Sequence, residues 1–188
     1  MIQSYANKLT LFLMKSETID KEEEEIYQYG FEVLIAFLVN IIAILGVASI
    51  FGKFTQTIAF LICYCCLRQY AGGFHASNYK KCLLLFICLY TSNIVILETL
   101  MSYGLRNLIF IISVISYIGI CLIGPMESEN NELDEDQLIK YKKITRCIAS
   151  IILLVSILIY GSIYSIYIGS ALILTSIMLV LELKRKKG

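Results

Sequence analysis

The chain has 188 residues, of which 58% are hydrophobic and 16% are charged, and its mean hydropathy is +0.75. Soluble globular chains are about 45–50% apolar and about 25% charged, so this composition excludes a soluble enzyme, a disordered chain and a secreted disulfide scaffold. The net charge of +1 gives no reason to expect a nucleic-acid partner. The one proline, Pro125, permits long helices elsewhere. We therefore expect an all-α integral membrane protein.

Residues 1–30 have neither the long apolar run nor the cleavage site of a signal peptide. Their apolar residues recur at intervals of three and four, which predicts a short amphipathic helix lying along the membrane interface. A frayed cytoplasmic helix is the alternative. The apolar stripe consists of Ile2, Tyr5, Ala6, Leu9, Phe12 and Leu13. The acidic run at residues 22–25 indicates the solvated start of the next helix.

Six apolar segments follow this amphipathic stretch. The first, residues 31–51, is long enough to cross a hydrocarbon core of about 30 Å. The second, residues 54–67, is too short unless it borrows length from residues 69–73. The remaining four are residues 82–97, 105–123, 147–160 and 163–183. We expect about six transmembrane helices in a single membrane domain.

The basic residues test this count, because Lys and Arg collect in the cytoplasmic loops of membrane proteins. If six segments cross and the amino terminus is inside, fourteen of the sixteen basic residues lie on one side and only Lys53 and Arg106 on the other. Both termini are therefore predicted in the cytoplasm of a multi-pass protein. The predicted organisation is a single domain, 1–188, with cytoplasmic or interfacial helices at 1–30, a membrane core at 31–183 containing a catalytic loop at 68–82, and a basic tail at 184–188. A second interfacial helix is expected in the polar segment after Pro125.

The single histidine, His75, lies in the most polar stretch between two apolar segments. An ionisable side chain at membrane depth suggests a functional site. Cys82 follows seven residues later, and a thiol becomes an effective nucleophile when a base or a cation stands beside it. Residues seven apart in one helix are separated by about 10.5 Å along its axis, so the helix must break between or before them. Gly72 and Gly73 supply that break.

Cationic and polar residues surround this pair in the sequence. Arg68, Lys80 and Lys81 would favour a thiolate and attract an acidic peptide, although they also act as membrane anchors. Gln69 and Ser77 are candidates to orient the histidine or to bind an oxyanion. The sequence does not choose between them.

The other six cysteines lie in or beside apolar segments, where cysteine packs as a small apolar residue. The odd total argues against a complete disulfide framework. Cys65, Cys66 and His75 fit no usual zinc spacing, so no metal and no other cofactor is expected.

The stretch RQYAGGFHA at residues 68–76, followed by Cys82, resembles the motif of the accessory gene regulator protein B family of bacterial quorum-sensing peptidases. The likeness extends over most of the chain, including GFEVLIAFLVN at residues 30–40 and the turn at residues 124–127. It implies a cysteine endopeptidase of the bacterial cell membrane, with its active site on the cytoplasmic side and with His75 and Cys82 as the catalytic pair.

The same resemblance implies a substrate and partners. The enzyme would remove the carboxyl-terminal tail of the precursor of an autoinducing peptide and let the remainder cyclise to a thiolactone or lactone. A homodimer and contact with membrane lipid are implied as well. A peptide transporter or exporter without catalysis is the main alternative, and a membrane scaffold is another. A transporter would leave the pairing of His75 with Cys82 unexplained, and paired broken helices in two halves are not evident.

Overall fold

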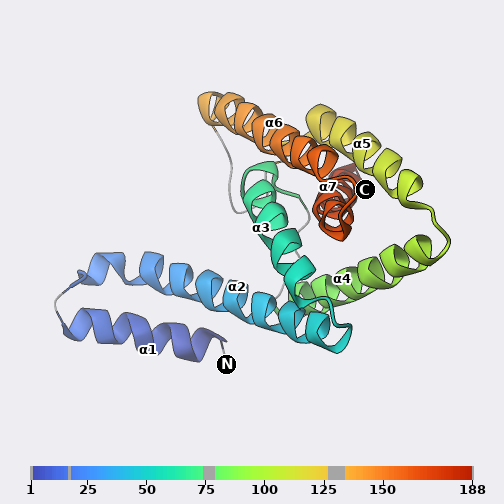
Figure 1. Cartoon of the computed structure of the whole chain (residues 1–188). Coiled ribbons are helices and arrows are strands. Elements are labelled where there is room, and N and C mark those ends of the chain that lie inside the picture. The colour runs from blue at the N-terminus through green and yellow to red at the C-terminus, as the bar shows by residue number, and fades with distance from the viewer. Residues whose placement is uncertain (1, 17, 74–78, 127–133, 188) are drawn as a thin grey trace.

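The computed structural model describes residues 2–16, 18–73, 79–126 and 134–187, and Figure 1 shows that these residues form long helices. Apart from one isolated β-bridge, the described residues contain no strand, which confirms the all-α prediction. A short 3-10 turn, Lys21–Glu23, leads into the second helix. The α-helices are α1 Ile2–Lys15, α2 Glu24–Ile50, α3 Phe54–Ala71, α4 Tyr79–Ser102, α5 Arg106–Ile123, α6 Glu135–Leu158 and α7 Ile163–Lys187.

Helix α1 runs antiparallel along the first half of α2 (Figure 1). Its small residues Ala6 and Thr10 are fully buried. Three larger members of the predicted stripe, Tyr5 at 57%, Leu9 at 44% and Phe12 at 68%, are exposed, whereas Ile2 and Leu13 are partly buried. The amphipathic helix is confirmed, and its small residues are the ones buried in the structure. Its position at the membrane interface stays a prediction.

Within the described ranges, four helices are long and apolar enough to cross a membrane. They are α2 with its leading turn, α4, α5 and α7. Helix α3 has 18 residues, as α5 does, but they include the polar residues Gln56, Arg68 and Gln69, and the first half of α6 is strongly charged. Six long helices therefore follow α1 among the described residues, whereas crossing by all six stays a prediction.

Several helix boundaries differ from the predicted ones. The predicted interfacial helix and the fifth span form one continuous helix, α6, which starts at Glu135. This helix is not interrupted, because residues 135–158 contain neither Gly nor Pro. The backbone N–H of Asp134 donates to Gln137 Oε1 at 3.3 Å, which caps this start. The predicted catalytic loop, 68–82, is longer than the connection between the two helices, because α3 continues to Ala71 and α4 begins at Tyr79.

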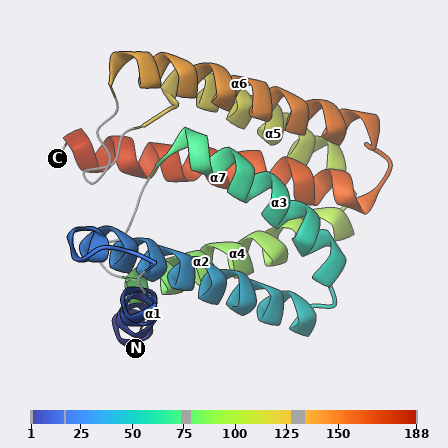
Figure 2. The same cartoon turned by 90° about the vertical axis from the view of Figure 1, so that its left-hand side faces the viewer.

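Helix α7 lies at the centre of the bundle, against α3, α5 and α6 and in contact with α4 (Figures 1 and 2). In its most apolar stretch 67% of the residues are buried, against 22% in α4 and in α5. Small residues make this packing possible: a Cβ on Gly169 would come within 2.8 Å of Ser113 Oγ. Within a membrane no hydrophobic effect drives helices together, so their association depends on close packing. Small residues permit that packing, because they let the helix backbones approach closely.

Figure 2 shows that alternate helix ends gather at two ends of the bundle. We call one the site end, where α3, α5 and α7 finish and α2, α4 and α6 start. The opposite end holds the turns between α2 and α3, α4 and α5, and α6 and α7, with Lys53 and Arg106. Lys53 and Arg106 thus lie at the same end of the bundle, in agreement with the predicted distribution of the basic residues. The assignment of the site end to the cytoplasm stays a prediction.

Candidate functional site

Helix α3 ends at the site end with Arg68 in its last turn. The backbone N–H of Gly72 donates to the Arg68 carbonyl at 3.1 Å, and the Arg68 guanidinium Nη1 donates back to the Gly72 carbonyl oxygen. Gly72 and Gly73 have φ values of 68° and 114°, which L side chains rarely adopt. The predicted glycine break between the two apolar segments is therefore present.

The glycine turn is also closely packed against two distant segments. Gly72 forms a parallel β-bridge with Met126, whose backbone N–H donates to the Ala71 carbonyl at 3.0 Å. A Cβ on Gly72 would overlap the Met126 carbonyl oxygen. A Cβ on Gly73 would overlap the Arg68 guanidinium and lie 3.2 Å from the backbone carbonyl carbon of Met178. The end of α3, the connection after α5 and the last turns of α7 thus meet at these glycines.

Cys82 lies in the first turns of α4 and is half-buried. One turn further along α4, the Phe86 ring stacks on Tyr64 of α3, with centroids 5.1 Å apart. Arg68 lies one turn further along α3 than Tyr64, and Cys82 lies one turn before Phe86 on α4.

The other predicted site residues have different placements. Lys80 and Lys81 are exposed in the first turn of α4, and Gln69 is exposed on α3. His75 and Ser77 lie outside the described residues, in the connection from α3 to α4. The pairing of His75 with Cys82 accordingly stays a prediction.

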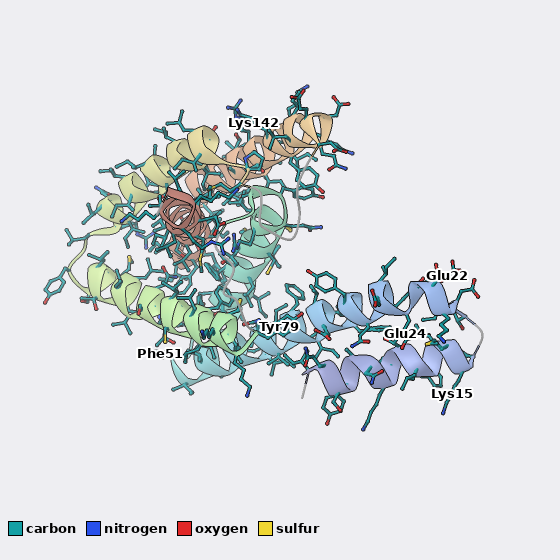
Figure 3. The ribbon with its side chains drawn as sticks, turned by 180° about the vertical axis from the view of Figure 1, so that it is seen from behind. Lys15, Glu22, Glu24, Phe51, Tyr79 and Lys142 are labelled. Atoms are coloured by element: carbon teal, nitrogen blue, oxygen red, sulfur yellow. The ribbon has the colours of Figure 1, made fainter. Side chains whose placement is uncertain are left out.

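The sequence analysis missed a buried carboxylate close to the start of α4. Glu32 of α2 is only 9% exposed and accepts a hydrogen bond from the Tyr79 hydroxyl at 3.2 Å. Tyr79 is the first residue of α4, three positions before Cys82, and Figure 3 labels it between α4 and α2. The signal in the sequence was an acidic residue inside the apolar stretch at residues 30–40, which marks a functional candidate.

A second buried carboxylate, Glu182, lies one turn beyond Met178 on α7. Glu182 Oε1 lies 2.7 Å from Arg185 Nη2, while Oε2 is buried and has no hydrogen-bond partner in the described part of the chain. Both atoms belong to a side chain with 1% exposure. Spacing along the sequence did not reveal three buried polar residues near the site end, which are Glu32, Tyr64 and Glu182.

Helix α6 presents lysines beside the end of α3. Tyr141 of α6 packs edge-on against Tyr70 of α3, with centroids 5.6 Å apart. We call the exposed lysines near this contact the basic face of α6, and Figure 3 shows one of them, Lys142, on that helix. The basic face consists of Lys140, Lys142 and Lys143.

All seven cysteines are free thiols. In the ranges that the structure describes, no three histidine, cysteine or acidic side chains come together in a way that would hold a metal ion. Cys66, Cys88 and Cys147 are exposed on the outer surfaces of their helices. Cys82 differs from these three in being half-buried.

Comparison with known proteins agrees with the motif. The family model described as accessory gene regulator B matches residues 6–183. The AgrB-like protein 1 of Clostridium perfringens strain 13 is 28% identical over 149 residues, covering 79% of each chain. The accessory gene regulator protein B of Staphylococcus haemolyticus is 27% identical over 160 residues, covering 84% of this chain and 82% of its own. No solved structure matches. The chain therefore belongs to the accessory gene regulator B family.

Proposed function

We propose that this protein is a membrane cysteine endopeptidase that cuts the tail from a quorum-sensing precursor peptide and lets the remaining segment cyclise. The observation that carries the proposal is the match of the chain to the family from residue 6 to residue 183, with the half-buried Cys82 in the first turn of the helix that follows the glycine turn in the chain. His75 lies in the short connection between these groups in the sequence. Cys82 is the proposed nucleophile and His75 the proposed base.

In the first step His75 removes the proton from the Cys82 thiol, and the thiolate attacks the scissile carbonyl carbon. The carbonyl oxygen becomes an oxyanion as the carbon–sulfur bond forms. When this intermediate collapses, the carbon–nitrogen bond breaks and His75 returns its proton to the departing amine. The tail leaves with a free amino group, and the rest of the precursor stays attached to Cys82 as a thioester.

In the second step a cysteine or serine within the precursor attacks the thioester carbonyl, and the Cys82 thiolate leaves and regains a proton. If the attacking group is a thiol, one thioester replaces another, so ring closure needs no ATP. Water is the competing nucleophile and would give a linear peptide. A site at the end of a helix bundle in the membrane limits that competition, because helices and lipid restrict the access of water.

The described surroundings of Cys82 favour this chemistry. The thiol lies near the amino-terminal end of α4, where the helix dipole is positive, and the exposed Lys80 and Lys81 belong to the same turn. Positive charge at this place stabilises an oxyanion that develops during cleavage. The absence of side chains at Gly72 and Gly73 lets this turn pack closely against Met126 and Met178.

Precursor recognition is proposed to be partly electrostatic. An amphipathic leader would lie at the inner membrane interface, and an acidic tail would be attracted by Lys80, Lys81 and the basic face of α6. Each exposed pair contributes about 1 kcal/mol or less, so the attraction guides the tail and does not by itself fix its position. The proposal includes six crossings, both termini in the cytoplasm, and a homodimer.

The test replaces Cys82 and His75 in cells that co-express a candidate precursor with an internal Cys or Ser and an acidic tail. We expect Cys82→Ser to reduce cleavage about a thousand-fold or more, while the variant still inserts normally. His75→Ala should bind uncut precursor in a pull-down but fail to form the thioester. Mass spectrometry of the peptides measures both effects.

Cys88→Ser is the matched control, since Cys88 is an exposed cysteine on the same helix, and it should process the precursor at the wild-type rate. Comparable cleavage by wild type and Cys82→Ser would contradict the proposed nucleophile. Export of the uncut precursor by wild type would instead support the transporter alternative.

A further inference from the structure

A tyrosine hydroxyl donates to a glutamate of another helix at each end of the bundle. At the site end the Tyr79 hydroxyl of α4 donates to Glu32 Oε2 of α2 at 3.2 Å. At the opposite end the Tyr167 hydroxyl of α7 donates to Glu98 Oε1 of α4 at 3.0 Å. The two hydrogen bonds have the same chemistry but lie at different distances from Cys82 along α4, so the second can serve as a control for the first.

The surroundings of the two glutamates differ. Glu98 Oε2 lies 2.7 Å from Lys53 Nζ, and the Glu98 side chain is 38% exposed. Glu32 is only 9% exposed, and the described residues give it no ion partner. A buried carboxylate that loses its hydrogen-bond donor is costly, and hydrogen bonds to charged groups are stronger than those between neutral groups. The bond from Tyr79 to Glu32 therefore links α2 firmly to the first turn of α4.

The first turns of α4 bury little of their surface. No side chain among residues 79–89 is buried, and the buried residues of this helix begin at Tyr90. The main packing neighbour of α4 is α2, and Tyr79 lies where the start of α4 meets that helix (Figure 3). With so little buried surface, the position of the first turn depends strongly on individual contacts, and the hydrogen bond to Glu32 is one of them.

Cys82 follows Tyr79 by three residues on α4. Side chains three positions apart on a helix are neighbours, with Cβ atoms about 5–6 Å apart, so a shift of Tyr79 moves the thiol as well. We propose that Glu32 and Tyr79 are positioning residues, which fix the first turn of α4 on α2 and thereby place the Cys82 thiol for attack on the scissile carbonyl. This inference rests on the proposed function. Neither side chain touches the reacting atoms in this scheme, and both act through the backbone of α4.

Tyr79→Phe keeps the ring and removes only the hydroxyl. We expect it to lower kcat about 10- to 100-fold and to change KM less than about twofold, because the nucleophile is misplaced while peptide docking is unchanged. Tyr167→Phe is the matched control, and its kcat should stay within about twofold of wild type. It should lower the denaturation midpoint in detergent at least as much as Tyr79→Phe, since Tyr167 is fully buried. Equal losses of kcat in both variants would overturn the proposal, because general destabilisation would then explain them.

Two substitutions of Glu32 separate the hydrogen bond from the charge. Glu32→Gln keeps an oxygen that can accept from Tyr79, so its kcat should stay within about threefold of wild type. Glu32→Leu removes the acceptor and should lose as much kcat as Tyr79→Phe. The double variant Glu32→Leu with Tyr79→Phe should lose little more than either single variant, because both changes break the same bond. An equal loss in Glu32→Gln and Glu32→Leu, or single losses that multiply in the double variant, would contradict the proposal.

A second readout does not depend on peptidase activity. In a regular helix the amide N–H groups of residues 83–86 donate to the carbonyls of residues 79–82, so their hydrogen exchange reports whether the first turn of α4 is ordered. Mass spectrometry should show faster exchange of these amides in Tyr79→Phe and in Glu32→Leu, and no change in Tyr167→Phe. If wild type does not cut any precursor, the proposed function fails while this measurement still decides whether the bond orders the turn. Unchanged exchange in Tyr79→Phe would refute the positioning role.

Discussion

The two ends of the bundle use glycines with the same backbone conformation in very different surroundings. At the opposite end Gly52 and Gly104 have φ values of 65° and 71°, and a Cβ on either would meet no atom within 4 Å. At the site end Gly72 has a φ of 68°, yet a Cβ there would overlap the backbone of Met126. A positive φ therefore serves only to turn the chain at one end, whereas at the other it also permits close packing of segments distant in sequence.

The charged residues of the two ends differ in a parallel way. At the opposite end Lys53 Nζ lies 2.7 Å from Glu98 Oε2, and the Tyr167 hydroxyl donates to Glu98 Oε1 at 3.0 Å. Arg106 there donates to the backbone carbonyl of Tyr160. The basic face of α6 at the site end is exposed. Charge at the opposite end ties helices together, and the charges of the basic face of α6 are available to a partner.

The largest expected effect sharpens the comparison of the glycines. Gly72→Ala adds a methyl group that overlaps the Met126 carbonyl, so the glycine turn must shift and carry Arg68 with it. We expect cleavage of the precursor to fall about a hundred-fold or more, because small displacements of positioned groups cost about two orders of magnitude. Gly104→Ala has the same backbone strain, about 1–2 kcal/mol, without the overlap. Its cleavage rate should stay within about twofold of wild type, and equal losses in both variants would break the distinction.

A smaller effect tests the basic face of α6. Reversing Lys140, Lys142 and Lys143 to Glu should raise KM about tenfold for a precursor with an acidic tail and leave kcat nearly unchanged, because the interaction is made equally in the ground and transition states. The increase should shrink at high salt. Steady-state kinetics at two ionic strengths measures it.

A control with the same change in charge uses the exposed residues Lys8, Lys15 and Lys21, which lie on or just after α1. That triple reversal should leave KM within about twofold. If it raises KM as much as the changes on α6, the attraction is a property of net charge and not of the basic face.

The smallest effect on activity is expected at the opposite end. Glu98→Gln removes the charge partner of Lys53 but keeps an oxygen that can accept from Tyr167. We expect a loss of about 1 kcal/mol in the free energy of unfolding and a kcat within about twofold of wild type. Denaturation in detergent and the cleavage assay measure the two quantities. A large fall in kcat at unchanged stability would show that this end takes part in the reaction.

The sequence predicts the helices well, because long apolar runs and the scarcity of Pro and Gly leave few alternatives. It does not identify α7 as the central helix, since all six apolar segments have similar composition. The run Gly169, Ser170 and Ala171 was the available signal, because small residues mark close helix contacts. The contact of Gly72 with Met126 could not be predicted from the sequence, because it depends on how the connection after α5 returns to α3.

Part of the candidate site follows from motif spacing. Arg68, Gly72 and Gly73 lie together at the end of α3, because they are consecutive in the turn that ends this helix. The meeting of His75 with Cys82 stays a prediction. Tyr64 was missed although it lies one turn before Arg68. Its contact with Phe86 depends on the relative rotation of α3 and α4, which a single sequence does not determine.

The central position of α7 has a consequence for biosynthesis. The ribosome makes α7 after the other helices described, so the helices on either side of it lack their common packing surface until α7 has emerged. The backbone of Met178, against which Gly73 packs, is also absent until then. A nascent chain that stops before α7 thus lacks the assembled glycine turn, and the fold itself delays the completion of the site end until α7 has been made.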